Sequence, residues 1–238
     1  MKVDVLAFGA HPDDIELGAG GTIAREVAAG RRVGLIDLTR GELGTRGSAE
    51  LRDKEAAAAA EVLGVEFRTN LGFRDGFFKN DEAHQREVIR FIRLCQPEVI
   101  ICNAIRDRHP DHQKGAELVS TAAFLSGLGK ISTRWEEDEQ EPWRPKAVYH
   151  FIQDRYIQPD FVVDISDFME VKMRSVMAFG SQFYNPASGE PATAISSREF
   201  IEFLYARCLD HGRPAGFHYA EGFTVERFPG LRSFFDLH

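Results

Sequence analysis

Two short stretches of the 238-residue sequence concentrate side chains that could bind a metal ion or move protons. The first is His11–Asp14 (HPDD) and the second is Arg108–His112 (RHPDH). Either stretch alone is typical of an ordinary turn, because proline fixes φ and aspartate caps a following helix. Together they offer three histidines and three aspartates, and this repeated combination favours a shared functional site.

The chemistry that this set of side chains favours is hydrolysis assisted by a metal ion. Neutral imidazoles and a carboxylate suit a catalytic zinc ion, which takes three protein ligands and leaves one position open for water. Fe2+, Mn2+ and Co2+ accept similar ligands, so the sequence favours zinc without deciding which metal is bound.

The adjacent carboxylates Asp13 and Asp14 cannot do the same task, because neighbouring side chains of an extended turn point in different directions. If Asp14 binds the metal, Asp13 is free to take a proton from a water bound to it, as a general base. His109 could donate a hydrogen bond to the developing oxyanion or a proton to the leaving group. Asp111 could orient His109 by accepting its other ring N–H, or cap a helix that begins near Gln113.

Each of the two stretches follows a short apolar run that is typical of a buried strand. The first half of the chain alternates such runs with helical patterns, an order that indicates βαβ units. We therefore predict an α/β, Rossmann-like fold, a mostly parallel sheet with helices on both faces and the active site at the carboxyl ends of the strands. The expected strands are 3–9, 33–38, 65–71 and 99–102, and the expected helices are 18–29, 49–63, 84–94 and 113–125.

The second half of the chain has a looser pattern. Its acidic segment Trp135–Trp143 is typical of an exposed loop, and Ser166 is a candidate N-cap for a helix that ends near Phe179. Because we find no internal repeat and no linker, we predict that residues 1–238 form a single domain. The remaining expected strands are 147–152, 161–165 and 222–228, and the last expected helix is 197–209.

Composition and charge disfavour several classes of protein. With 43% hydrophobic and 28% charged residues, the chain has an ordinary globular composition. Its formal charge of −8 repels phosphate groups, so we expect neither nucleic acid nor an anionic membrane as a partner. No apolar run approaches the roughly 20 residues of a transmembrane helix, and the N-terminus does not resemble a signal peptide. Three scattered cysteines are typical of reduced thiols, so we expect a cytoplasmic protein.

The motifs resemble those of the zinc-dependent deacetylases of the LmbE/PIG-L superfamily. AHPDD follows the first predicted strand, TRGELGTRG and LRDKE follow the second, and RHPDH follows the fourth. SQFY at 181–184 and YAEGF at 219–223 resemble one branch more closely, the deacetylases of N-acetylglucosaminyl malate in bacillithiol biosynthesis. The resemblance implies a hydrolase that removes the acetyl group from an N-acetylglucosamine conjugate, with GlcNAc-malate as the expected substrate.

The resemblance also implies roles for individual residues of the two stretches. Two histidines and one carboxylate would hold the metal, and the remaining carboxylate of the first stretch would be the general base. His109 would act on the oxyanion or on the leaving group. The implied metal ligands are His11, Asp14 and His112, and the implied general base is Asp13.

Two arginines occupy positions where the superfamily places arginines near the substrate. Arg52 and Arg108 could each bind a carboxylate of malate through two parallel hydrogen bonds. Arg52 could instead pair with Glu55 on the same helix face. The glycine-rich segment 39–47 would then form a loop over the site, and Tyr184 is a candidate for stabilising the oxyanion.

Three alternatives stay open. A related enzyme could deacetylate another N-acetylated sugar, of the chitobiose or antibiotic type. A nucleotide-binding α/β domain is disfavoured, because AHPDD replaces the glycine-rich turn that such domains place after the first strand. A non-catalytic metal-binding protein is the third alternative, although it would not need a free Asp13 beside the ligands. The resemblance further implies a homo-oligomer, and the expected partner is a small N-acetylated glycoside.

Overall fold

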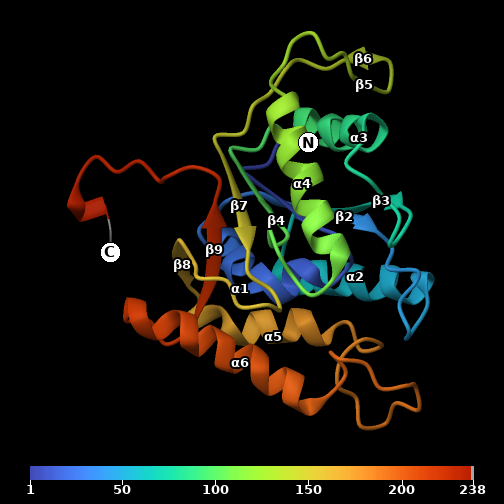
Figure 1. Cartoon of the computed structure of the whole chain (residues 1–238), viewed down its shortest axis with the longest axis vertical. Helices are drawn as coiled ribbons and strands as arrows, with labels where there is room; N and C mark the ends of the chain where they lie inside the picture. The colour runs from blue at the N-terminus through green and yellow to red at the C-terminus, as the bar shows by residue number, and fades with distance from the viewer. Residues whose placement is uncertain (237–238) are drawn as a thin grey trace.

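A seven-stranded sheet lies at the centre of the computed structural model, which describes residues 1–236 (Figure 1). Its strands are β1 (Val5–Gly9), β2 (Val33–Thr39), β3 (Phe67–Phe73), β4 (Val99–Cys102), β7 (Ala147–Phe151), β8 (Phe161–Asp164) and β9 (Ala220–Val225). They follow the order β3-β2-β1-β4-β7-β9-β8. The first five strands in this order run parallel, whereas β9 is antiparallel to β7 and β8. The predicted mostly parallel α/β sheet is confirmed.

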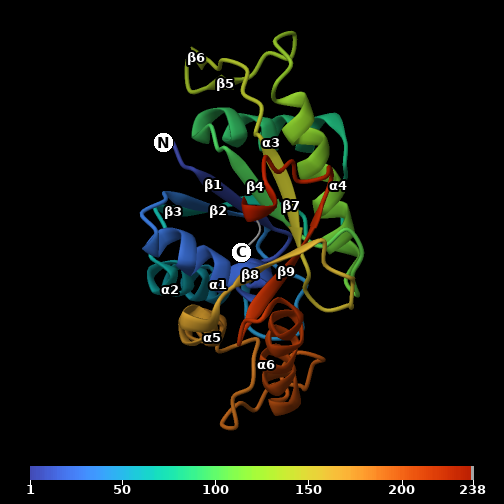
Figure 2. The same cartoon turned by 90° about the vertical axis from the view of Figure 1, so that its left-hand side faces the viewer.

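Helices cover both faces of this sheet (Figure 2). One face carries α3 (Glu82–Cys95) and α4 (Pro110–Leu125), and the other carries α1 (Asp14–Ala28), α2 (Ala49–Leu63), α5 (Met169–Met177) and α6 (Arg198–Gly212). Strand β1 shows why two layers form, because its side chains alternate between the faces. Leu6 and Phe8 pack in the same core as α3 and α4, whereas Val5 and Ala7 pack with α1. Within residues 1–236, none of the helices has the length and apolar character needed to cross a bilayer.

Local signals in the sequence explain where two of these helices begin and end. Ser48 caps α2 by accepting the Leu51 N–H at 3.2 Å, and Gly64 ends the helix with a left-handed φ of 71°. Asp81 caps α3 by accepting the N–H of His84 at 3.1 Å. Short polar side chains at the N-cap and glycine at the helix end are the expected signals, and the predicted positions of both helices are confirmed within a few residues.

Two helices begin earlier than predicted, and both differences bring reactive side chains onto a helix. α1 begins at Asp14 rather than at Gly18, because the glycine-rich run that follows weakens the helical pattern in the sequence. α4 begins at Pro110 rather than near Gln113, since proline is well accommodated in a first helical turn. Asp14 and His112 are therefore placed by rigid helical turns and not by flexible loops.

The second half of the chain differs from prediction at one helix start. The hydroxyl of Ser166 donates to Asp164 Oδ1 at 2.6 Å, and a 3-10 turn at residues 166–168 precedes α5. The predicted capping role of Ser166 is therefore wrong. The acidic segment after residue 134 is mostly exposed, as predicted, but it contains a short hairpin of β5 (Arg134–Trp135) and β6 (Asp138–Glu139).

A fully buried ion pair joins α5 and β9 to helix α1. Lys172 Nζ lies 2.6 Å from Glu221 Oε1 and donates to the carbonyl groups of residues 16–17 at 2.8 Å each. The Glu221 carboxylate accepts the N–H groups of residues 21–22 at 3.1 and 2.7 Å. The charges are thus bonded on both sides to the backbone of α1, and the pair fixes the helix whose first residue is Asp14.

Replacing Lys172 with Met should lower the free energy of unfolding by about 3–5 kcal/mol, because it leaves the buried Glu221 carboxylate without its cation. Chemical denaturation measures this change. Lys146→Met is the matched control, since Lys146 pairs with Glu98 at the surface, with side chains 69% and 57% exposed. The control should change stability by at most about 1 kcal/mol. Equal effects of the two substitutions would contradict a structural role for the buried pair.

Candidate active site

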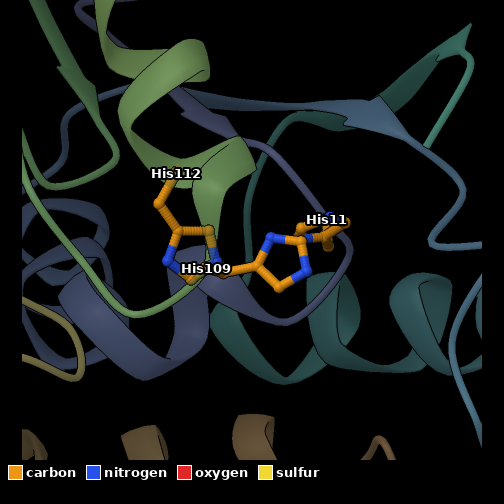
Figure 3. Close-up of side chains that lie close together, drawn as sticks. All are labelled: His11, His109 and His112. Carbon is orange, nitrogen blue, oxygen red and sulfur yellow. The ribbon is translucent and has the colours of Figure 1, made fainter. Parts of the chain in front are cut away.

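The two stretches that carry reactive side chains meet at the carboxyl edge of the sheet. Strand β1 pairs in parallel with β4, so the segments that follow these strands lie side by side. The rings of His11, His109 and His112 cluster there, with centroids 4.6 to 5.7 Å apart (Figure 3). They border a cavity of about 220 Å³, which the glycine-rich segment 39–47 also lines.

The Asp14 carboxylate lies at the centre of this cluster. Its Oδ2 accepts the backbone N–H of His11 at 2.9 Å and the side-chain amide of Asn103 at 3.0 Å. Its Oδ1 accepts the side-chain amide of Gln153 at 2.6 Å. The same carboxylate lies 3.4 Å from His11 Nδ1 and 3.2 Å from His112 Nε2. Asp14 is therefore held rigidly with one ring nitrogen of each histidine facing it.

A second carboxylate holds the far nitrogen of each histidine ring. Asp75 Oδ1 lies 3.1 Å from His11 Nε2, and Asp107 Oδ2 lies 2.7 Å from His112 Nδ1. Because an ionised carboxylate only accepts hydrogen bonds, both of these ring nitrogens carry a proton. In the neutral rings the other nitrogen then bears a lone pair, and both lone pairs face Asp14.

This set of donor atoms fits a divalent cation. Two imidazole lone pairs and a carboxylate that face one another repel unless a positive charge lies among them. A proton can supply that charge: burial disfavours protonation of His112, but Asp14 and Asp107 outweigh it and raise the pKa to about 9. A ligating histidine whose other N–H is bound by a carboxylate is also the usual arrangement in metal sites. The three predicted ligands, Asp14 with His11 and His112, are thus brought together as a site would require.

Two groups of side chains have ligand atoms that all lie within 4.8 Å of one another, and neither of them includes Asp14. An ion held by His11, Asp75 and Asp111 would leave the lone pairs that face Asp14 without compensation, whereas an ion held by the three histidines would use them. The two groups are His11, His109 and His112, and His11, Asp75 and Asp111.

Asp13 lies beside these groups with its carboxylate free of the helix that it precedes. Its φ of 116° lies in the left-handed region that favours glycine. Residues other than glycine that adopt this strained backbone conformation are concentrated at functional sites. The side chain does not cap α1, and its Oδ2 accepts a hydrogen bond from Arg52 Nη2 at 2.8 Å. Burial raises the pKa of Asp13 to about 7, and Arg52 opposes the rise. Such a carboxylate can both accept and release a proton near neutral pH.

The ring of His109 caps helix α4. Its Nδ1 accepts the backbone N–H of Asp111 at 3.3 Å, so the neutral ring carries its proton on Nε2. Burial lowers the pKa of His109, and the neighbouring rings of His11 and His112 lower it further. The ring is therefore neutral at physiological pH and offers an N–H donor at the edge of the cavity.

The Asp111 carboxylate does not contact His109 in the way that we predicted. Its Oδ2 accepts the Gly76 N–H at 2.7 Å and lies 3.5 Å from His11 Nε2, and its Oδ1 lies 2.5 Å from Lys114 Nζ. The predicted orientation of His109 by Asp111 is wrong, and so is the alternative that Asp111 caps α4, because His109 holds that position. Since α4 begins one residue before it, Asp111 lies in the first helical turn, where its side chain reaches the segment after β3.

The two predicted substrate-binding arginines already pair with aspartates of the chain. Arg52 is buried, and besides Asp13 it donates to two backbone carbonyl groups. It forms no ion pair with Glu55 within residues 1–236, so that alternative is not realised. Arg108 is 48% exposed at the rim, where its Nε lies 3.1 Å from Asp154 Oδ2. Both arginines border the cavity, and their contact with a substrate stays a prediction.

Comparison with known proteins assigns the chain to a family. The family model described as PIG-L, GlcNAc-PI de-N-acetylase, matches residues 6–123. A diacetylchitobiose deacetylase of Thermococcus kodakarensis is 30% identical, over 95% of this chain and 84% of its own length. The chain belongs to the PIG-L/LmbE family. This membership confirms the resemblance inferred from the two motifs.

Solved structures extend the likeness of this PIG-L/LmbE protein to almost the whole chain. A conserved protein of Thermus thermophilus is 35% identical and superposes with a TM-score of 0.86, covering 98% of both chains. An N,N'-diacetylchitobiose deacetylase of Pyrococcus horikoshii is 26% identical with a TM-score of 0.80, covering 98% of this chain and 88% of its own. The family model and the relatives from Thermococcus kodakarensis and Pyrococcus horikoshii are described as deacetylases, which hydrolyse an amide bond, so the predicted enzyme class is confirmed.

Several residues that complete the site were not predicted. Asp75, Asp107, Asn103 and Gln153 all bind a predicted ligand, but none belongs to the HPDD or HPDH motif. Part of the signal was available, because Asn103 directly follows β4 and Gln153 lies two residues after β7. Polar residues at the carboxyl ends of parallel strands are candidates for the same site. Tyr184, the candidate for oxyanion stabilisation, does not border the cavity within the described part of the chain.

Asp107→Asn should weaken zinc binding by about 10–100-fold, because a neutral amide no longer increases the basicity of the His112 ring. Competition with a chelating dye measures the affinity. Asp154→Asn is the control, since Asp154 pairs with Arg108 at the rim and does not contact the histidines. Its affinity for zinc should match that of the wild type. An unchanged affinity in the Asp107 variant would count against His112 as a ligand.

Proposed function

We propose that this PIG-L/LmbE protein is a zinc-dependent N-deacetylase that removes the acetyl group from an N-acetylglucosamine conjugate. The observation that carries the proposal is the position of Asp13. Its carboxylate borders the cavity beside the convergent donor atoms of His11, Asp14 and His112, and it makes no hydrogen bond to them. A site that only stored metal would not require a carboxylate that lies beside the ligands without binding them and whose charge is partly offset by Arg52. When bound by the three residues, a divalent ion polarises the amide carbonyl and lowers the pKa of water.

In this proposal, Asp13 acts as the general base. It takes a proton from the water that attacks the carbonyl carbon of the acetamido group, and it can return that proton to the departing amine. Arg52 fixes one carboxylate oxygen through its hydrogen bond of 2.8 Å. The left-handed backbone at Asp13 keeps the carboxylate from capping α1, so the group stays available for proton transfer.

His109 stabilises the charge that develops on the substrate oxygen. Its Nδ1 is occupied by the N–H of Asp111, which leaves the Nε2–H as the donor. A hydrogen bond to the forming oxyanion strengthens as negative charge accumulates, and this difference lowers the barrier. Burial and the neighbouring histidines lower the pKa of His109, so the ring is neutral. The neutral ring donates this hydrogen bond from its Nε2–H.

Two kinds of conjugate agree with this chemistry and differ in the group attached to the sugar. GlcNAc-malate, the substrate expected from the sequence motifs, requires cationic groups that are free to bind carboxylates. Arg52 and Arg108 are both paired with aspartates of the chain, which weakens the argument for malate. Diacetylchitobiose, the substrate named for the Thermococcus kodakarensis relative, carries a neutral second sugar instead.

Deacetylation can be tested directly by mass spectrometry of products. Zinc-loaded protein incubated with N-acetylglucosamine, GlcNAc-malate and diacetylchitobiose should release acetate and a free amine from at least one of them. Removing the metal with a chelator should abolish the reaction, and adding zinc back should restore it. Absence of any deacetylated product from zinc-loaded protein would contradict the proposed function.

Asp13→Asn should lower kcat by about 10²–10⁴-fold while the zinc content stays near that of the wild type, because the amide cannot accept the proton. Steady-state kinetics and metal analysis of the same preparation measure both quantities. Asp53→Asn is the control: Asp53 is an exposed aspartate that pairs with Arg40, and its loss should leave kcat unchanged. Retention of most of kcat by the Asp13 variant would exclude it as the base, and loss of zinc would make it a ligand.

A further inference from the structure

A buried group of polar side chains lies behind Asp14, between strands β4, β7 and β9. Strand β7 lies between the other two strands (Figure 2), and its residue His150 is 3% exposed. The ring contacts both neighbours: Nδ1 lies 2.9 Å from the carbonyl oxygen of Asn103, and Nε2 lies 3.1 Å from Glu226 Oε1. Asn103 directly follows β4, and Glu226 directly follows β9. His150 therefore connects three neighbouring strands, although it belongs to neither of the two sequence motifs.

Each ring nitrogen of His150 faces an acceptor. A backbone carbonyl and an ionised carboxylate only accept hydrogen bonds, so Nδ1 and Nε2 both carry a proton and the ring is a cation. Burial disfavours this cation, but contacts with Cys102, Glu226 and the Asn103 carbonyl outweigh it and raise the pKa of the ring to about 11. The Glu226 carboxylate also accepts a hydrogen bond from the Ser120 hydroxyl, which fixes the group that holds Nε2.

The thiol of Cys102 is a further neighbour of this ring. Its Sγ lies 3.3 Å from His150 Nδ1, so Cys102, His150 and Glu226 resemble the cysteine, histidine and carboxylate of thiol enzymes. Cys102 is fully buried, however, and neither it nor His150 borders the active-site cavity within residues 1–236. A substrate cannot reach the sulfur, so the group has no nucleophilic role.

Asn103 links His150 to the Asp14 carboxylate. The hydrogen-bond ladder between β4 and β7 ends at the pair Cys102 and His150, so Asn103 lies one residue beyond it. The His150 ring holds the Asn103 backbone at this point. The Asn103 side chain is fixed in turn, because its Oδ1 accepts the Ala10 N–H at 2.8 Å and its Nδ2 donates to Asp14 Oδ2 at 3.0 Å. A shift of the Asn103 backbone would therefore weaken a hydrogen bond that orients Asp14.

We infer that His150 is a positioning residue of the metal site, because its Nδ1–H fixes Asn103 and thereby the Asp14 carboxylate. The inference rests on the proposed zinc site and adds to it a residue that contacts neither the ion nor the substrate. Loss of a group that orients a metal ligand usually weakens metal binding by about 10–100-fold. His150 acts one step further from the ion, so we expect an effect at the lower end of this range.

Two substitutions separate the two hydrogen bonds of His150. His150→Asn places an amide N–H near the position of Nδ1, so it keeps the donor to Asn103 and loses the contact with Glu226. His150→Gln places an amide near the position of Nε2, so it keeps the contact with Glu226 and loses the donor to Asn103. In competition with a chelating dye, His150→Gln should weaken zinc binding about tenfold, whereas His150→Asn should match the wild type.

Equal zinc affinities of the two variants would overturn the inference, because a purely structural role does not distinguish the two hydrogen bonds. Nitrogen-15 NMR of the wild type gives a second readout that requires no substitution. Both ring nitrogens of His150 should be protonated at neutral pH, and a ring without a proton on Nδ1 would also overturn the inference. Wild type that binds no zinc would reject the inference together with the proposed function. Zinc-loaded wild type that deacetylates no sugar would reject the proposed function alone.

Discussion

The hydrogen bonds to the Asp14 carboxylate fix the geometry on which the rest of the site depends. They come from His11, Asn103 and Gln153, and so they connect the segments that follow β1, β4 and β7. Burying a carboxylate costs several kcal/mol in desolvation, and hydrogen bonds to its oxygen atoms offset this cost. The folded state therefore strongly favours the positions of the groups that donate these hydrogen bonds to Asp14. Burial opposes ionisation, but His112 and His11 outweigh it and hold the pKa of Asp14 well below its usual value. The ionised carboxylate is thereby ready to bind a cation.

The site carries more buried negative charge than its own cations offset. Five aspartates lie within it, and within residues 1–236 the lysine and arginine side chains that pair with them are Arg52, beside Asp13, and Lys114, beside Asp111. Protonated histidines supply the missing charge when no metal is present, and a divalent ion supplies it when bound. Metal binding is therefore expected to stabilise the folded chain as well as to activate it. The five aspartates are Asp13, Asp14, Asp75, Asp107 and Asp111.

The sequence predicted the parts of this account that depend on local pattern. Buried strands, the helices between them and the meeting of HPDD with HPDH all follow from periodicity and from the geometry of parallel sheets. Contacts between distant segments could not be predicted in the same way. Arg52 reaches Asp13 because α2 packs beside α1, and Asp75 reaches His11 from the segment after β3. The error at Asp111 arose from a shift of less than one turn at the start of α4, which changes the direction of every side chain in that turn.

Anomalous diffraction from crystals grown with zinc tests the central claim most directly, because it locates the ion independently of activity. The account predicts a single strong peak between His11 Nδ1, the Asp14 carboxylate and His112 Nε2, with Asp75 and Asp107 still bound to the opposite ring nitrogens. A peak bound instead by Asp75 and Asp111, or by the three histidines without Asp14, would contradict it.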